Sequence, residues 1–228
     1  MRQKLTRPGG LAGAFLLASV ATGAEAAPAQ SQAPAPAVSP APGGDAAPRI
    51  ATASSRPAGR VGRRMTKRGR VTPAVAGRRM RLQVSSARGW RTVARTRTRA
   101  GGRYVLALRP GHAFSARARV VALAPGGRRA TRGIGRLEVY RVAVASWYGP
   151  GLYGNPTGCG GTLTTASVGV AHKSLPCGTR VTLKHRGRRL RVPVIDRGPY
   201  VGNREYDLTS AVARRLGFSG HGGVLVTR

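Results

Sequence analysis

Short runs with strand character, several of which alternate apolar and polar residues, recur from residue 80 onward, and they constrain the fold more than any other feature. They lie at 80–84, 90–98, 104–108, 116–123, 137–142, 181–183, 190–194 and 224–226. Side chains of a strand point alternately to the two faces of a sheet, and the glycine-rich turns between these runs suit antiparallel pairing. The sequence therefore predicts a mainly β protein.

The charge of the chain is very unbalanced. Of 228 residues, 40 are Lys or Arg and 6 are Asp or Glu, which gives a net charge of +34. Such an excess points to an anionic partner. The arginines are dense at 60–142, where we interpret them as an adhesive face for an anionic polymer. The alternative is that they only solvate the outer face of each strand.

The N-terminus has the pattern of a secretory signal peptide. Three basic residues precede an uncharged stretch at 8–23, and the small-residue triplet Ala24-Glu25-Ala26 follows it. We expect cleavage after residue 26 and export; the alternative, an uncleaved membrane anchor, would need a longer apolar run. Residues 27–59 are rich in Ala, Pro and Ser, which predicts a disordered linker.

The remaining chain divides by composition into two parts. Residues 60–142 predict a small β-sandwich-like module, similar to immunoglobulin-like or carboxypeptidase-regulatory-like modules. Residues 143–228 predict a compact domain that contains a β-hairpin at 181–194 and one short helix at 208–216. Thr209 is placed to cap this helix and Gly217 lies just past its end.

Four blocks of the second part resemble the rare lipoprotein A (RlpA)-like family. They are Ala145-Ser-Trp-Tyr-Gly149, Ala171-His-Lys-Ser-Leu-Pro-Cys-Gly-Thr-Arg-Val181, Val194-Ile-Asp-Arg-Gly-Pro-Tyr200 and the segment 207–217. The resemblance implies a six-stranded double-psi β-barrel with one short helix over residues 143–228. It also implies a wall polysaccharide as ligand and, as in some members, lytic cleavage of peptidoglycan strands.

Cys159 and Cys177 are the only cysteines. In an exported protein we expect them to form a disulfide. The alternatives are a thiol nucleophile paired with His172 and metal binding by the pair. With two cysteines and four histidines, the sequence predicts no metal site and no cofactor.

Asp207 and Asp196 are the candidate catalytic carboxylates. The resemblance to expansins and endoglucanases, which share the barrel, places both in one sugar-binding groove, where paired carboxylates can do glycosidic chemistry. The alternatives are structural: Asp196 bracing the turn at 197–200, and Asp207 capping the helix. Glu205 is expected to be exposed, with a third groove acid as the alternative.

His172 matches a histidine of the family and is the third candidate catalytic residue, with a structural role as the alternative. The lytic members carry a Glu where this chain has Gly161, so one proposed catalytic acid is missing. Tyr148 and Tyr200 are the candidate substrate-binding residues, since sugar rings stack on aromatic faces. Trp147 is expected to be buried as packing.

We therefore expect an exported cell-wall protein that acts on peptidoglycan, in the manner of RlpA-like lytic transglycosylases. The alternative is a non-catalytic, expansin-like protein that binds or loosens wall glycan. Its partners would be peptidoglycan or another wall polysaccharide, and anionic wall polymers through the basic module. We expect no nucleic-acid partner, no membrane span, a monomer, and a secreted or wall-associated location.

Overall fold

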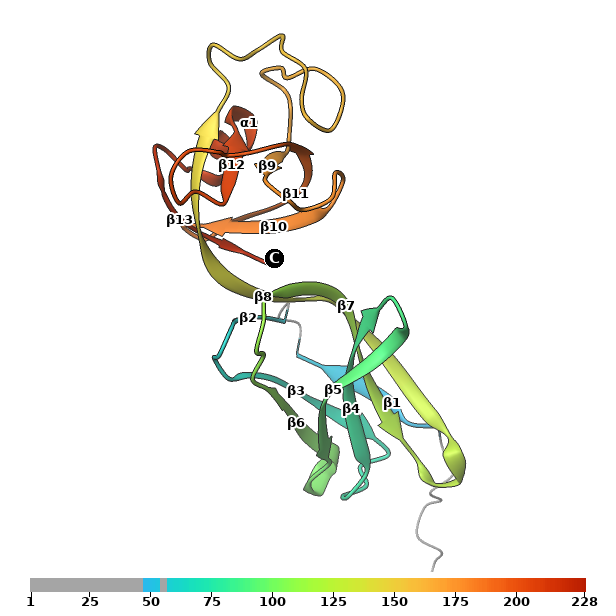
Figure 1. Ribbon diagram of the computed structural model, residues 1–228. Coiled ribbons are helices and arrows are strands. Elements are labelled where there is room, and N and C mark those ends of the chain that lie inside the picture. Colours follow the sequence, from blue (N-terminus) through green and yellow to red (C-terminus); the bar gives the residue numbers. More distant parts are fainter. Residues whose placement is uncertain (1–46, 54–56) are drawn as a thin grey trace, which may run out of the picture. The chain divides into compact units, whose positions relative to one another are not determined.

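A computed structural model describes residues 47–53 and 57–228 (Figure 1). The expected signal peptide and most of the expected linker lie outside the described residues. The described part is mainly β, as predicted, and its one α-helix is α1 (Ser210–Leu216). No helix within this part is long and apolar enough to cross a membrane.

The N-terminal module is built from two sheets (Figure 1). Its strands are β1 (Arg49–Thr52), β2 (Ala58–Arg60), β3 (Met65–Thr72), β4 (Arg79–Ser86), β5 (Gly89–Arg97), β6 (Arg103–Leu108), β7 (Phe114–Leu123) and the first part of β8 (Arg129–Tyr148). One sheet has the order β1-β3-β6 and the other β5-β4-β7-β8, with β2 paired to β8. Val71 and Leu106 of the first sheet share one core with Met80, Leu82 and Val120 of the second. The two sheets thus pack face to face, as in a sandwich.

The expected linker is too long at its C-terminal end. Residues 49–52 and 58–60, which lie inside the range 27–59, form β1 and β2. Ile50 packs against the core of the module, and β1 pairs with β3 along its whole length. The composition of this segment is that of a linker. It is nevertheless ordered, because its backbone pairs with a neighbouring strand and Ile50 is partly buried against the core.

The C-terminal part is a closed barrel. Its strands are the end of β8, β9 (Val170–His172), β10 (Arg180–His185), β11 (Arg188–Asp196), β12 (Tyr206–Thr209) and β13 (Gly222–Val226). They follow the order β12-β9-β11-β10-β13-β8, and parallel pairing of β12 with β8 closes the ring. Apolar side chains from all six strands fill its interior, among them Leu183, Val192 and Leu208. The predicted six strands and single helix are present.

The hairpin and the helix form where the sequence predicted them. The turn between β10 and β11 is made by Arg186 and Gly187, both with positive φ, which suits a two-residue hairpin turn. Gly217 ends α1 in the left-handed conformation. The prediction for Thr209 was wrong in one respect: it is the N-cap residue, but its side chain makes no capping bond, and its hydroxyl lies 3.4 Å from the backbone nitrogen of Gly169 instead.

One disulfide and one ion pair stabilise this part of the chain. Cys159 and Cys177 form the predicted disulfide, which ties the long loop after β8 to the turn before β10. Glu138 of β8 is fully buried, and its carboxylate accepts hydrogen bonds from the Arg189 guanidinium and, over 2.7 Å, from the Tyr140 hydroxyl. Because both partners are present, the buried charge of Glu138 is compensated.

Candidate functional site

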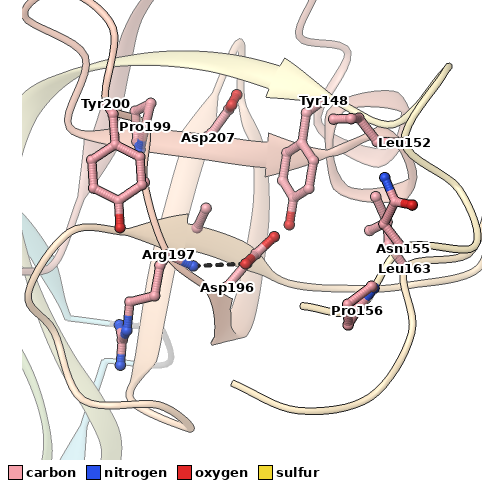
Figure 2. A pocket seen from close by; sticks show the side chains of 12 residues that line it. Tyr148, Leu152, Asn155, Pro156, Leu163, Asp196, Arg197, Pro199, Tyr200 and Asp207 are labelled. Carbon is pink, nitrogen blue, oxygen red and sulfur yellow. Dashed lines mark hydrogen bonds between the residues drawn. The ribbon is translucent and has the colours of Figure 1, made fainter. Parts of the chain in front are cut away.

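A pocket of about 310 Å³ opens on the barrel where the long loop after β8 meets the end of β11 (Figure 2). It is lined by Tyr148, Leu152, Asn155, Pro156, Leu163, Ala171, Asp196, Arg197, Gly198, Pro199, Tyr200 and Asp207. Both predicted carboxylates and both predicted aromatic residues therefore belong to one pocket, although they come from three segments of the chain.

Asp207 lies on β12, between β8 and β9. Its backbone pairs with Ser146 on one side and Ala171 on the other. Its Oδ1 accepts a hydrogen bond of 2.8 Å from the Ser146 hydroxyl, which in turn accepts one of 3.0 Å from Nη1 of Arg204. Burial raises the pKa of Asp207, and the negative charge of Asp196 adds to this, while Ser146 and Arg204 oppose it. A carboxyl group with a raised pKa in a pocket is suited to donate a proton.

Asp196 lies at the end of β11 and is fixed by the backbone. Its Oδ1 accepts hydrogen bonds from the amides of Gly158, at 2.7 Å, and Arg197, at 2.8 Å. The close approach requires a glycine at 158, because a Cβ there would lie 2.7 Å from Cγ of Arg197. Asp196 therefore braces the turn, which was the structural alternative, and lines the pocket as well.

The aromatic residues differ in their exposure. The Tyr148 hydroxyl points toward Asp196 (Figure 2) and is buried without a hydrogen-bond partner in the described part of the chain. Burial and then the charge of Asp196 raise the pKa of Tyr148, so it remains a neutral phenol. Tyr200 is 75% exposed at the rim. Trp147 was expected to be buried but is 38% exposed, because the alternation of β8 turns it away from the neighbouring Ser146.

His172 does not line the pocket, although its neighbour Ala171 on β9 does. Its Nδ1 accepts hydrogen bonds from the amides of Ser174, at 3.1 Å, and Leu175, at 3.0 Å. Burial lowers the pKa of His172. Its position favours the structural alternative: the imidazole holds the turn after β9 and does not face the two aspartates.

Glu205 is neither exposed nor a groove acid, which corrects the expectation for it. Its carboxylate forms a two-point ion pair with Arg141, and its Oε1 lies 3.7 Å from Nε2 of His172. The hydrogen bonds from Arg141 lower the pKa of Glu205. This cluster lies outside the pocket and stabilises the segment that leads into β12.

Gly161, where the resemblance implied that a catalytic Glu is missing, offers no acid. Gly161 is exposed, has φ of 85° and does not line the pocket. Side chains other than glycine rarely adopt this conformation. Asp196 and Asp207 are thus the acids of the pocket, and no group of three or more His, Cys, Asp or Glu side chains in the described residues could hold a metal ion.

Sequence reasoning missed the two residues that connect to Asp207. Ser146 stands in a block that was recognised, yet it had no assigned role, and Arg204 lies in the turn before β12. Only the pairing of β12 with β8 brings Ser146 beside Asp207. No local pattern in the sequence marks this contact.

Comparisons with known proteins concern the barrel. Residues 141–227 match the family described as "Lytic transglycolase". A probable endolytic peptidoglycan transglycosylase RlpA of Synechocystis is 40% identical over 81 residues, which are 35% of this chain and 25% of the relative. The endolytic peptidoglycan transglycosylase RlpA of Campylobacter jejuni is 43% identical over 75 residues, or 32% of this chain and 27% of the relative. A probable endolytic peptidoglycan transglycosylase RlpA of Aquifex aeolicus is 39% identical over 87 residues, which are 37% of this chain and 38% of the relative. The chain thus spans well under half the length of these curated relatives.

Proposed function

With an RlpA-like double-psi β-barrel as its C-terminal domain, we propose that the protein is exported and that the barrel cuts peptidoglycan strands as a lytic transglycosylase. The observation that carries the proposal is the position of Asp207. Its carboxyl group is partly buried, its pKa is raised, and it shares a pocket with the fixed carboxylate of Asp196.

In this proposal a single carboxyl group serves twice. The protonated Asp207 donates its proton to the glycosidic oxygen while the bond from that oxygen to the anomeric carbon breaks. The 6-hydroxyl of the same muramoyl residue then attacks the anomeric carbon, and the Asp207 carboxylate accepts the proton that this hydroxyl releases. The product carries a 1,6-anhydro ring, no water is consumed, and Asp207 returns to its starting state.

The other pocket residues have supporting roles in the proposal. The negative charge of Asp196 stabilises positive charge that develops on the sugar ring in the transition state. Tyr200, with its ring exposed at the rim, and Tyr148 offer aromatic faces for sugar rings. His172 acts on the turn after β9 and takes no proton from substrate.

The second candidate function is non-catalytic binding or loosening of wall glycan, in the manner of expansins. The observation in its favour is Gly161, because the acid of the lytic relatives is absent and its backbone conformation favours glycine. In both candidates the protein acts as a secreted or wall-associated monomer, and the basic module holds it to anionic wall polymers.

The test compares variants on purified sacculi. Asp207→Asn should lower the release of soluble fragments at least about a hundredfold, because general acid catalysis contributes that much or more. The matched control is Glu205→Gln, which removes a carboxylate outside the pocket and should retain release. Asp196→Asn should also lose rate, and its melting temperature must be measured because it braces the turn.

The outcomes separate the two candidates. Fragments from the wild type but not from Asp207→Asn support the transglycosylase. Release by Asp207→Asn at the wild-type rate would show that another group supplies the proton. Binding of the wild type to sacculi without any release would favour the expansin-like function.

A further inference from the structure

A guanidinium is buried at one end of the N-terminal module, and two of its nitrogens have no partner among the described residues. Arg78, just before β4, is 8% exposed, and its Nε and Nη1 are buried with no hydrogen-bond partner in the described part of the chain. Its backbone is fixed by Thr98, whose Oγ1 and amide each form a 2.9 Å hydrogen bond with it. Burying a charge without a partner is costly. These two nitrogens are therefore uncompensated by the described residues.

Arg78 lines a pocket of about 330 Å³ with two kinds of wall. Arg79 and Arg97 join it on the cationic side, and Val75, Leu123 and Ala124 are apolar. Nη1 of Arg97 donates a 3.0 Å hydrogen bond to the carbonyl of Gly77, which fixes a second guanidinium at the pocket. This combination fits an oxyanion that is carried on an aliphatic chain.

The cationic surface continues from this pocket across the β4–β5 hairpin. A second hollow, of about 380 Å³, shares Arg79 and Arg97 with the first and adds Arg81 and Arg95. In the strand register Arg79 is opposite Arg97, and Arg81 is opposite Arg95. Like charges directly opposite each other destabilise a sheet, so this arrangement costs stability in the free protein.

The opposed arginine pairs end at the next position of the hairpin. The next pair on the same face is Gln83 and Thr92, two neutral side chains joined by a 3.2 Å hydrogen bond. No Asp or Glu occurs among the described residues before Glu138. Glu138 itself binds Arg189, and the ion pairs of the described residues include none of Arg79, Arg81 and Arg95.

We infer that these five arginines form a binding site for a linear phosphodiester polymer, with one phosphate in the Arg78 pocket and the chain continuing over the hairpin. The inference rests on the proposed function only in placing this polymer in the cell wall. A phosphodiester directs its two free oxygens apart, so two facing guanidinium groups can each bind one of them. Successive arginine pairs are about 7 Å apart along the strands, a spacing that a flexible polymer with one phosphate per short repeat can match.

The first experiment measures binding of inorganic phosphate and of poly(glycerol phosphate) to the full chain by calorimetry. Arg78→Met should weaken binding of both at least about tenfold, because a buried hydrogen-bonded charge contact is lost. The matched control is Arg88→Met, which removes the same charge from the exposed turn at the other end of the hairpin. Equal affinities of the two variants for either probe would overturn the inference.

A second pair of variants tests the path of the polymer. Arg81→Gln with Arg95→Gln should leave the affinity for inorganic phosphate unchanged. The same variant should weaken poly(glycerol phosphate) binding. The slope of log affinity against log salt concentration should become shallower by about 1.4, because two phosphate contacts are lost and each contributes roughly 0.7. The control, Arg63→Gln with Arg64→Gln, removes two charges from an exposed loop and should keep the wild-type slope. Equal losses in both double variants would show diffuse attraction only and overturn the inference.

A comparison with other polyanions tests whether the site prefers a flexible phosphodiester. Polygalacturonate, which carries carboxylates, and duplex DNA should each bind more weakly than poly(glycerol phosphate) at the same salt concentration. Tighter binding of either would overturn the assignment to a flexible phosphodiester. The proposed function is tested apart from this: both arginine variants should release fragments from phosphodiester-free sacculi at the wild-type rate, whatever the result with the polymer.

Discussion

Replacing Ser146 with alanine is expected to raise the pKa of Asp207 further. The Ser146 hydroxyl donates to Oδ1 of Asp207 over 2.8 Å and is itself oriented by Arg204, so it stabilises the charged carboxylate. A hydrogen bond to a charged group contributes about 1.5 to 3 kcal/mol, and the partial exposure of Asp207 favours the lower end. Since about 1.4 kcal/mol corresponds to one pH unit, the titration midpoint should move up by about one unit.

The titration can be followed directly by NMR with isotope-labelled aspartate. The chain has only three aspartates, Asp45, Asp196 and Asp207, and Asp207→Asn identifies the signal of interest. In an active protein, the pH at which the rate falls should move upward by the same amount, because the protonated acid is required. Ser210→Ala is the control: it removes the hydroxyl that bonds to Tyr153, over 2.8 Å, and should leave the midpoint unchanged. A midpoint that stays or falls in Ser146→Ala would refute the reasoning.

Three further predictions concern stability. Replacing Cys159 and Cys177 by serine should lower the free energy of unfolding by about 3 kcal/mol, measured by urea denaturation, because the disulfide closes a loop with a sequence separation of 18; an unchanged midpoint would contradict this. Glu138→Gln should cost about 3 kcal/mol, because it leaves Arg189 without its buried partner, and Arg189→Met in the same chain should restore part of the loss. Arg141 lowers the pKa of Glu205, so this pair adds stability above the ordinary Glu pKa that is lost as the pH falls through the lowered value. Glu205→Gln should therefore destabilise the protein at about pH 7 and flatten its loss of stability in acid, and an unaltered pH profile would show that the pair contributes nothing.

The parts of the fold that depend on local patterns could be predicted from the sequence. The β10–β11 hairpin and α1 follow from alternation, from apolar residues four apart, and from Gly187 and Gly217 at positions that need positive φ. β1 and β2 could not be predicted, because nothing in the Ala- and Pro-rich composition of the segment 27–59 marks them as strands. These strands form because β1 pairs with β3 and β2 pairs with β8, and no local sequence pattern reveals these pairings.

The site was predictable to the extent that family blocks identify its segments. The resemblance placed Asp196 and Asp207 in one groove, and the stacking of sugar rings on aromatic faces suggested Tyr148 and Tyr200. All four residues line one pocket. The resemblance did not show that the His172 side chain points away from the pocket. The face of β9 that meets the pocket depends on the register of β9 with β12. The Arg204–Ser146–Asp207 connection likewise depends on the parallel pairing of β12 with β8.

We propose that the barrel cleaves peptidoglycan by an internal attack and consumes no water. The most direct measurement is mass spectrometry of soluble fragments released from sacculi by the wild type in water enriched in heavy oxygen. We predict fragments that end in 1,6-anhydromuramoyl groups and carry no heavy oxygen, and their loss in Asp207→Asn. Fragments with reducing ends that contain heavy oxygen would contradict the account, because they would require attack by water.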